Sequence, residues 1–552
     1  MKQNNMVNDT VYGHIPYSKF EEKLLKSKIV NRLLFVSQNA LAYFAFPSIS
    51  TKRFIHSLGT MHVASHMFKN SLINADRTTN KKFLKNAKQE IEKLIKDNNL
   101  NINLKNLDIY DKSLLGFSFS LDKKYEVTYL ILLQALRLVG LLHDVGHLPF
   151  SHQTEYALKR LYYSIKKIEK PNKEQEGFLN FYEKITLNTE LVLHESIGSL
   201  YIDMLFKYEL LDLEEKNKEV IELYYLIVKN ILDNVVTKRF SYATLHDYVA
   251  SVIDADRIDY INRDLLASGY ISNSADFLRV TREAILIQEN AVFKLSFMSS
   301  GLADIEHLIE SRFNLYKKVF FTHSISRLDT LLEKVITYLS KEYLSNSPKD
   351  IKIYQSIAMM WKFSKEENRE KQLDIISQLD ENWLISLFKK EYFKIKYQET
   401  LTYQERYYLA AFEDILFGKH LFKTKWENLS SFYKLLDLSK NERYLLREKF
   451  GKVSLKKEKR LAKLLNGFIE RHNKDENYFA YSIVSLSIGI DKNFLLYDGE
   501  KTIKIGEVST IRKRLITSRS NTVPFYIFSN TKYLTDKMRG ELKEILFEVF
   551  LQ

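Results

Sequence analysis

The sequence contains no cysteine among its 552 residues. Disulfide bonds and thiolate metal ligands are therefore excluded, and any metal site must be built from imidazole and carboxylate groups. Only six prolines and 16 glycines occur, which is sparse for an all-β protein and favours long helices. The sequence shows no uncharged apolar run of about 18 residues, and its polar start has no signal-peptide core. We expect a mainly α, cytoplasmic protein that does not enter a membrane.

Basic residues outnumber acidic ones, 83 lysines and arginines against 69 aspartates and glutamates, and the formal net charge is +14. This excess permits nucleic-acid binding through phosphate neutralisation. It also fits lysine-rich, solvated helix faces, which is the interpretation we favour. A basic protein in addition draws polyanionic nucleotides toward a positive cleft. Charge alone therefore does not separate a nucleotide enzyme from a nucleic-acid-binding protein.

The chain is longer than a usual single domain, and its hydrophobic content of 45% suffices for a large core. We expect a helical core over residues 1–345, a helical extension over 346–475 and a small α/β domain over 476–552. Two charged insertions interrupt the core, one near 80–110 and one at 166–177, and the second is predicted to be a loop.

Hydrophobic periodicity predicts several helices and strands within these units. The predicted helices cover 191–206, 220–236, 247–264 and 301–338, and residues 291–296 alternate as a strand does. In the last unit, the segment 494–508 alternates around an Asp498-Gly499 turn signal. A strand over 523–528 and a helix over 535–551 follow it.

The stretch from His143 to His152 places three histidines and one aspartate within ten residues. It follows an apolar run, Leu130 to Val139, that is typical of a buried helix. Burying ionisable groups beside leucines is costly unless something binds them, and a metal ion is the obvious candidate. His143 and Asp144 offer adjacent nitrogen and oxygen ligands. His147 lies one helical turn beyond His143 and faces the same side without needing to bind the metal.

Other short motifs that contain histidine or aspartate lie before and after this stretch. Upstream, Arg53 to Gly59 reads Arg-Phe-Ile-His-Ser-Leu-Gly. Downstream are His194-Glu195 and the run Asp256 to Asp264, Asp-Arg-Ile-Asp-Tyr-Ile-Asn-Arg-Asp. Seven of the 13 histidines fall between positions 56 and 194, which composition alone does not produce. The pattern indicates a site assembled from several helices.

These four motifs, in this order, resemble the HD-domain deoxynucleoside triphosphate (dNTP) triphosphohydrolases. That family includes bacterial dGTPases and the vertebrate dNTP hydrolase with a SAM and an HD domain. The resemblance covers roughly residues 10–340, and four ordered motifs are far more specific than one His-Asp pair. It implies a helical HD-domain core and metal-dependent hydrolysis of a dNTP to a deoxynucleoside and inorganic triphosphate.

By this resemblance, the metal ligands are His56, His143, Asp144 and Asp256. Two nitrogens and two oxygens leave coordination positions for water and a phosphate oxygen. Such a set suits one divalent ion per active site, and manganese, iron, zinc, nickel, cobalt and magnesium all remain open.

The resemblance also assigns phosphate contacts and proton-transfer groups, which are Arg53, His147, His152, His194 and Arg257. We expect His152 to be the acid that protonates the leaving 5′ oxygen, with His194 as the second candidate, because imidazoles titrate near physiological pH. Arg312 is a further expected phosphate contact.

Sugar recognition falls by the same match to Gln38, Tyr260 and Asp264. A tyrosine ring packed under the ribose leaves no room for a 2′ hydroxyl, and a carboxylate accepts a hydrogen bond from the 3′ hydroxyl. The expected result is selectivity for deoxynucleotides, although Tyr260 could equally be an ordinary core residue.

Other polar residues near the motifs are expected to have supporting roles. His62 and His66 lie one helical turn apart, but helical geometry turns His62 away from His56, which favours packing or secondary contacts. Asp254, Asp259 and Glu195 are expected to be structural, and Glu195 could orient a histidine.

The chain departs from the family in two regions. Phe320-Phe321-Thr322-His323 replaces a Tyr-Gln or Tyr-Phe-His pattern, which leaves the base contacts and the preferred dNTP open. The vertebrate enzyme binds an effector nucleotide through the segment that matches residues 26–34, where this chain keeps only Arg32. That mode of allosteric control is therefore not expected, and any nucleotide effector would use other residues.

Three functions remain open from the sequence. The first is a dNTP triphosphohydrolase that controls nucleotide pools or acts in antiphage defence, and by analogy it is a homo-oligomer, a tetramer or hexamer. The second is an HD-type phosphodiesterase or nuclease on other nucleotides or single strands. The third is a nucleotide-sensing or single-stranded nucleic-acid-binding module without turnover.

Overall fold

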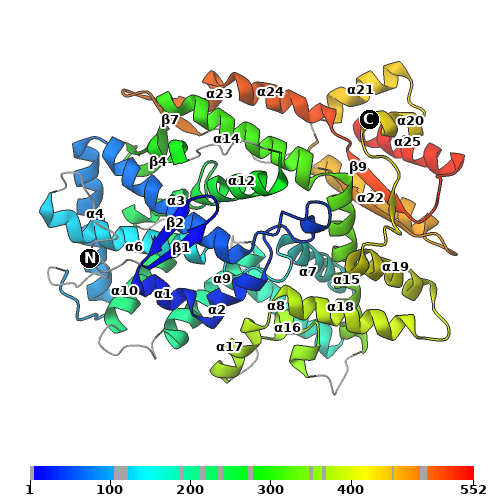
Figure 1. Cartoon of the computed structure of the whole chain (residues 1–552), viewed down its shortest axis with the longest axis horizontal. Coiled ribbons are helices and arrows are strands. Elements are labelled where there is room, and N and C mark those ends of the chain that lie inside the picture. The colour runs from blue at the N-terminus through cyan, green and yellow to red at the C-terminus, as the bar shows by residue number, and fades with distance from the viewer. Residues whose placement is uncertain are drawn as a thin grey trace.

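The structure is a computed structural model of the chain. It describes residues 5–104, 122–186, 192–210, 218–233, 240–270, 278–346, 352–363, 368–450, 453–484 and 494–551. Helices dominate these residues, and the strands form small sheets (Figure 1). The predicted mainly α fold with a small α/β part is confirmed. The ends of three predicted segments, 105–110 of the first insertion, 191 of one helix and 234–236 of another, lie outside the described residues.

Two long helices pack against each other at the centre of the fold, α3 (Arg53–Asn74) and α6 (Glu126–Leu142). They approach closely because Gly140 has no side chain. A Cβ there would lie 2.8 Å from the Cα of Met61. The segment Lys123–Leu142 has the length and hydropathy of a membrane span, and 89% of that window is buried inside the protein.

Three shorter helices carry the remaining motifs beside this pair: α7 (His152–Ile165), α9 (Leu193–Met204) and α12 (Ala255–Ser268). The connection from α6 to α7 is the His-Asp stretch itself. α12 packs on α3, so the first and last motifs lie side by side.

The other helices up to residue 346 surround this centre. They are α1 (Lys19–Leu25), α2 (Lys28–Asn31), α4 (Arg77–Asp97), α8 (Lys173–Thr186), α10 (Lys218–Leu232), α13 (Leu278–Arg282), α14 (Leu302–Leu315) and α15 (His323–Asn346). The charged helix α4 is amphipathic, and it buries Phe83, Leu84 and Ile91 completely against the core.

The following part of the chain is helical, as predicted for the extension. Its helices are α16 (Met359–Lys362), α17 (Arg369–Ser377), α18 (Glu381–Lys396), α19 (Tyr403–Phe417), α20 (Leu429–Leu435), α21 (Lys440–Phe450) and α22 (Leu455–His472). α19 packs against both α18 and α15, which joins the extension to the core.

The described strands form three sheets. β1 (Asn5–Asp9) and β2 (Gly13–Tyr17) are an antiparallel hairpin. The second sheet has the order β3 (Ala284–Glu289), β4 (Val292–Met298), β7 (Leu495–Tyr497), β8 (Thr502–Lys504). The third has the order β5 (Lys423–Thr424), β9 (Phe525–Ser529), β6 (Phe479–Ile483). Three of these pairings, β4 with β7, β5 with β9 and β6 with β9, join strands that are far apart in the sequence.

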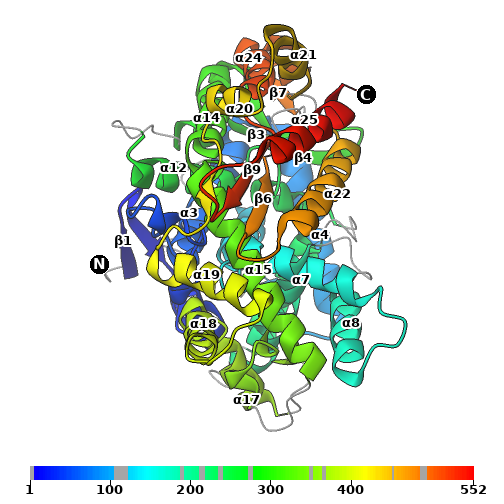
Figure 2. The same ribbon diagram turned by 90° about the vertical axis from the view of Figure 1, so that its right-hand side faces the viewer.

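The C-terminal segment is closely joined to the rest of the molecule. β7 pairs in parallel with β4, with Phe297 opposite Leu496. β6 and β9 lie beside α15, and α25 (Asp536–Phe550) packs on α22 (Figure 2). Two short helices, α23 (Ile505–Val508) and α24 (Thr510–Ser518), follow β8, and α24 lies along α14. The boundaries proposed at 345 and 475 stay a prediction.

Three predicted elements are wrong in their limits. Instead of one helix over 247–264, a 3₁₀ helix covers Ser241–Tyr248, and α12 begins at Ala255, because the Asp254 side chain caps it by accepting the N–H of Arg257. The helix predicted over 301–338 is split into α14 and α15 by a π-helical turn, Tyr316–Phe320. Residues 173–177 of the second insertion begin α8 rather than a loop.

Candidate active site

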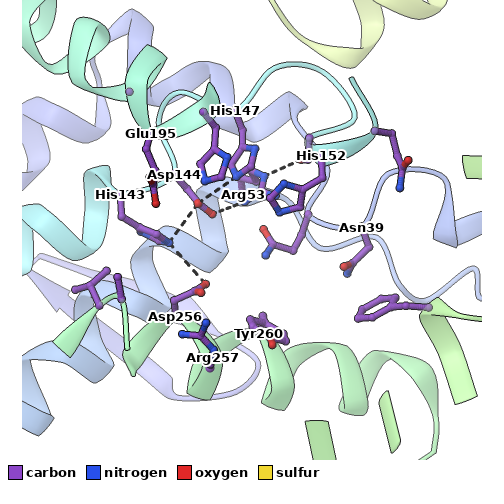
Figure 3. Close-up of a pocket in the computed structure, with 18 of the residues that line it drawn as sticks. Asn39, Arg53, His143, Asp144, His147, His152, Glu195, Asp256, Arg257 and Tyr260 are labelled. Carbon is purple, nitrogen blue, oxygen red and sulfur yellow. Dashed lines mark hydrogen bonds and ion pairs between the residues drawn. The ribbon is translucent and has the colours of Figure 1, made fainter. Parts of the chain in front are cut away.

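The four motifs line one cavity of about 1260 Å³. Figure 3 shows side chains from α3, α12 and the α6–α7 connection pointing toward a common space. We call the cavity surface formed by these motifs the motif wall. Its members in the cavity lining include Arg53, His143, Asp144, His147, His152, His194, Asp256, Arg257 and Tyr260.

His56, His143, Asp144 and Asp256 meet at one end of the motif wall. The Nε2 atom of His56 lies 3.0 Å from Asp256 Oδ1 and 3.4 Å from Asp144 Oδ2. The Nε2 atom of His143 lies 3.4 Å from Asp144 Oδ1 and 3.7 Å from Asp256 Oδ1. Two imidazoles and two carboxylates thus converge from three segments that span 200 positions of the chain, from His56 to Asp256.

The donor set of this first cluster fits a divalent metal ion. Ligand atoms of His56, His143 and Asp256 all lie within 4.8 Å of one another. Within the described part of the chain, the buried Nε2 atoms of both histidines lack a hydrogen-bond partner. Buried ring nitrogens are rarely left so, and a cation would satisfy both at once.

Secondary contacts hold both imidazoles in the orientation that a metal ligand needs. His56 Nδ1 lies 2.7 Å from Asp259 Oδ2, and His143 Nδ1 lies 2.8 Å from the carbonyl oxygen of Gly140. Each contact leaves Nε2 facing the cluster, as outer contacts of metal-binding histidines do. Asp259 is itself held by Arg263, which also pairs with Asp9 at 2.7 Å.

Electrostatics keeps the first cluster ionised although it is buried. Burial opposes the charge on Asp144, but Arg53, which pairs with it directly, and the nearby histidines hold its pKa well below the usual range. Burial likewise opposes a charge on His56, yet the carboxylates of Asp144, Asp256 and Asp259 raise its pKa well above the usual value. The carboxylates of Asp144 and Asp256 thus carry the negative charge that a bound cation would neutralise.

His147, His152, His194 and Glu155 form a second cluster on the same wall. Glu155 Oε1 lies 3.0 Å from His147 Nδ1 and 3.5 Å from His152 Nδ1, and Glu155 Oε2 lies 3.0 Å from His194 Nδ1. The rings of His147 and His194 are stacked with centroids 4.0 Å apart. Burial and Arg53 lower the pKa of His147 to about 3, whereas Glu155 raises that of His194 despite burial.

The backbone of the α6–α7 connection is held by Arg32 and by close contact with α9. Arg32, which is buried, donates to the carbonyl oxygens of Val145 and His147 and also to that of Leu379. Gly146 touches α9 so closely that a Cβ would lie 2.0 Å from the backbone oxygen of His194. Arg32 thus holds the backbone of the His143 to His152 motif in place from inside the protein.

The turn before His152 has an unusual backbone. Phe150 and Ser151 have φ values of 58° and 54°, in the left-handed region that costs non-glycine residues about 1–3 kcal/mol each. The Ser151 hydroxyl accepts from Arg53 Nε at 2.8 Å and donates to the Ser37 carbonyl at 2.9 Å. This strained turn sets His152 as the first residue of α7, with its side chain 54% exposed to the cavity.

The predicted phosphate contacts lie on the motif wall and on α14. Arg257 forms an ion pair with Asp254, which fixes the arginine side chain. Burial lowers the pKa of Arg257, but the carboxylates of Asp254 and Asp256 outweigh this effect and raise it. Arg312 lines the cavity and its guanidinium lies 5.7 Å from the centre of the Tyr316 ring. Among the described residues, the buried Nε atoms of both arginines lack partners.

Of the three residues predicted to contact the sugar, two lie at the cavity surface. Gln38 and Tyr260 line it, and their buried Oε1 and Oη atoms lack partners within the described residues. Asp264 is fully buried behind Asn39, whose amide donates to its Oδ1 at 2.9 Å. Burial raises the pKa of Asp264 to about 7. Asn39 therefore stands between Asp264 and the cavity.

Two residues of the site were missed from the sequence. Glu155 lies one turn after His152 on α7, a spacing that could have revealed it. Asn39 had no signal apart from its neighbour Gln38. Glu195, considered for orienting a histidine, is exposed and instead accepts the backbone N–H of Val192 at 3.1 Å.

The structure also places the other residues that the sequence analysis singled out near the motifs. His62 and His66 pack edge to face with centroids 4.5 Å apart, and His62 contacts the Tyr12 ring. Asp254 caps α12, and Phe320 and Phe321 line the cavity.

Another part of the cavity lining, which we call the far wall, consists of residues that no motif contains. This far wall consists of Arg160, Asp329, Glu333 and Tyr481, from α7, α15 and β6. Glu333 pairs with Arg160. Burial, followed by the charge of Glu333, raises the pKa of Asp329 to about 8.

Known proteins resemble this chain in part. An HD domain-containing protein of Acanthamoeba polyphaga mimivirus is 22% identical over 331 residues, which is 60% of this chain and 56% of that protein. A Dictyostelium discoideum homolog of the deoxynucleoside triphosphate triphosphohydrolase SAMHD1 is 22% identical over 386 residues, covering 68% and 59%. Mus musculus SAMHD1 is 23% identical over 305 residues, covering 54% and 37%. The HD-domain resemblance is confirmed.

The solved structures extend this likeness to the fold. A phosphohydrolase from Bacteroides thetaiotaomicron matches with a TM-score of 0.56 and 17% identity, over 95% of this chain and 99% of that one. No protein-family model matches the chain. The chain spans about half the length of the first curated relatives it matches, 56% and 49%.

Proposed function

We propose that this HD-domain protein is a metal-dependent dNTP triphosphohydrolase, which converts a dNTP to a deoxynucleoside and inorganic triphosphate. One observation carries the proposal: the side chains of four ordered motifs converge on one cavity and leave buried nitrogen and oxygen atoms without partners there. A bound ligand and ion would satisfy these atoms. The named activity of the SAMHD1 relatives supports the same substrate class.

His56, His143, Asp144 and Asp256 would hold one divalent ion. When bound, such an ion polarises a phosphate oxygen and lowers the pKa of a coordinated water. Asp259 and the Gly140 carbonyl keep the two imidazoles oriented for this role.

The arginines of the cavity bind and orient the triphosphate. A nucleoside triphosphate carries about four negative charges at neutral pH, so fixed cations must offset them. Arg257 is immobilised by Asp254, and Arg312 by its contact with Tyr316. Arg53 is already paired with Asp144, so its main contribution is to hold that ligand and to add positive charge nearby.

His152 delivers the proton that the reaction needs. Water attacks the α-phosphorus, the bond from phosphorus to the 5′ oxygen breaks, and the leaving oxygen takes a proton. His152 is the exposed imidazole of the second cluster, with Nδ1 toward Glu155, so its Nε2 would be the atom that donates the proton. His194, hydrogen-bonded to the same carboxylate, is the second candidate, and His147 supports both rings.

The sugar contacts fall to Tyr260 and Gln38 at the cavity surface. Tyr260 is placed to exclude a 2′ hydroxyl, and the unpartnered Gln38 oxygen can accept from the 3′ hydroxyl. Asp264 acts through Asn39, which it holds in position.

A product assay tests the proposal. The protein is incubated with each dNTP and NTP in the presence of Mn²⁺, Mg²⁺, Fe²⁺ or Co²⁺, and the phosphate product is identified. Inorganic triphosphate and free deoxynucleoside support the proposal. Pyrophosphate or single phosphate would instead identify another HD-type hydrolase, and single-strand binding with a steep salt dependence but no hydrolysis would identify a binding module.

The assembly and the setting of the activity also belong to the proposal. We propose a cytoplasmic homo-oligomer that acts on nucleotide pools or against phage. The buried position of Arg32 supports the expectation that residues 26–34 do not bind an effector nucleotide.

A further inference from the structure

The second cluster has the composition of a metal site of its own. Ligand atoms of His147, His152, Glu155 and His194 all lie within 4.8 Å of one another. Three imidazole nitrogens and one carboxylate oxygen form the kind of donor set that binds Zn²⁺ tetrahedrally. No residue of this set belongs to the first cluster.

Hydrogen bonds within the second cluster leave one buried ring nitrogen, Nδ1 of His147, without a partner among the described residues. His147 is only 1% exposed, and its Nδ1 atom makes no hydrogen bond in the described part of the chain, although Glu155 Oε1 lies 3.0 Å away. The single carboxylate faces three Nδ1 atoms, so its two oxygens are shared among three rings. A cation between the four groups would satisfy the buried nitrogen that the carboxylate leaves unpaired.

The second cluster also has the outer contact that is typical of a bound metal. The other ring nitrogen of His147, Nε2, lies 3.3 Å from Asp144 Oδ1. Metal-binding histidines usually donate their second N–H to a carboxylate, which fixes the ring. Asp144, a member of the first cluster, therefore also lies beside the second cluster through His147.

We propose that His147, His152, Glu155 and His194 form a second transition-metal site, and that an ion bound there inhibits the enzyme. Binding follows from the donor set alone. Inhibition rests on the proposed function, because an ion on His152 Nδ1 takes the place of the proton at that atom, and the ring then no longer releases the Nε2 proton to the leaving oxygen near neutral pH.

Zinc stoichiometry tests the site without any assay of activity. The full chain, freed of metal by chelation, is titrated with Zn²⁺ alone, and bound ions per chain are counted by calorimetry and elemental analysis. We expect two ions for the wild type. Glu155→Gln should lower the count to one, because an amide oxygen is a much weaker zinc ligand than a carboxylate. Asp256→Asn should also leave one ion, but at the second cluster.

The control is Glu195→Gln, the same substitution next to His194 in the same cavity. Its carboxylate is outside the second cluster, so two ions should remain. His194→Gln gives an independent removal of a ligand, and thermal unfolding shows whether each variant is folded. One ion on the wild type, or two on folded Glu155→Gln and His194→Gln, would overturn the site.

The inhibitory half is tested on the wild type. Activity supported by Mn²⁺ should fall at least tenfold as Zn²⁺ fills the second site, and a zinc chelator should restore it. Full activity with two zinc ions bound would overturn inhibition while leaving the site intact. If no dNTP is hydrolysed under any condition, the proposed function fails, yet the zinc count still decides the second site.

Discussion

The motif wall and the far wall of the cavity handle buried charge in opposite ways. On the motif wall, carboxylates lie among cations and imidazoles, so that the pKa of Asp144 stays well below the usual range. On the far wall, Asp329 and Glu333 lie near each other with Arg160 as the paired cation, and the pKa of Asp329 rises to about 8. The first arrangement keeps charges ready for chemistry. The second is suited to shaping the cavity, at a cost in stability.

The sharpest test of this difference is removal of a ligand from the first cluster. His143→Ala and Asp144→Ala should each abolish tight binding of the first metal ion and lower kcat/KM at least about a thousandfold, which is ~4 kcal/mol of transition-state stabilisation. Steady-state kinetics and metal analysis measure both effects. His62→Ala removes a histidine of α3 that only packs against rings, and it should retain metal and activity. Activity within tenfold of wild type in a metal-free His143→Ala protein would refute the role of the first cluster.

A smaller loss is expected from the carboxylate of the second cluster. Glu155→Gln removes the negative charge that orients His152 and His194, and kcat should fall about a hundredfold, the usual size of a general-acid contribution. The pH dependence of kcat should change as well, since Glu155 raises the pKa of His194. Glu195→Gln is the matched control. Equal losses in the two variants would mean that Glu155 has no special position.

The sugar side of the motif wall should affect selectivity more than rate. Tyr260→Ala removes the ring that would exclude a 2′ hydroxyl, so the ratio of kcat/KM for a dNTP over the matching NTP should fall about tenfold. Competition between dATP and ATP measures this ratio directly. An unchanged ratio in a variant that still hydrolyses dATP would assign Tyr260 to packing alone.

The comparison also explains how much the sequence could predict. Motif residues such as His56 and Asp256 could be predicted because their types and order are specific, and the structure brings them together although 200 positions separate them. Glu155 was missed because it lies beyond the last motif residue, His152, and only its helical spacing from that histidine marks it. Asp329 and Tyr481 could not be found, since they reach the cavity only through the packing of α15 and the pairing of β6 with β9.

The predicted limits of two helices were wrong for a related reason. The break near Tyr316 to Phe320 is a π-helical turn, and nothing in the apolar spacing of 301–338 distinguishes it from a continuous helix. Asp254 was predicted to be structural, but its capping of α12 depends on a hydrogen bond to the backbone of Arg257 that periodicity does not report. The residue types thus revealed the motifs, while a local side-chain cap and a π-helical turn decided where these helices begin and end.

The smallest effect is expected on the far wall, where it should appear in stability and not in chemistry. A carboxyl with a raised pKa holds its proton more tightly in the folded chain, so its cost to stability grows as the pH rises from its usual value near 4 to about 8. Asp329→Asn cannot ionise. The free energy of unfolding of this variant, relative to wild type, should therefore increase by at least about 1 kcal/mol between pH 5 and pH 8. Denaturant unfolding at each pH measures the difference, and Asp536→Asn, at a carboxylate that is 91% exposed, should show no such trend. A constant difference for Asp329→Asn would mean that the far wall, like the motif wall, neutralises its buried charge.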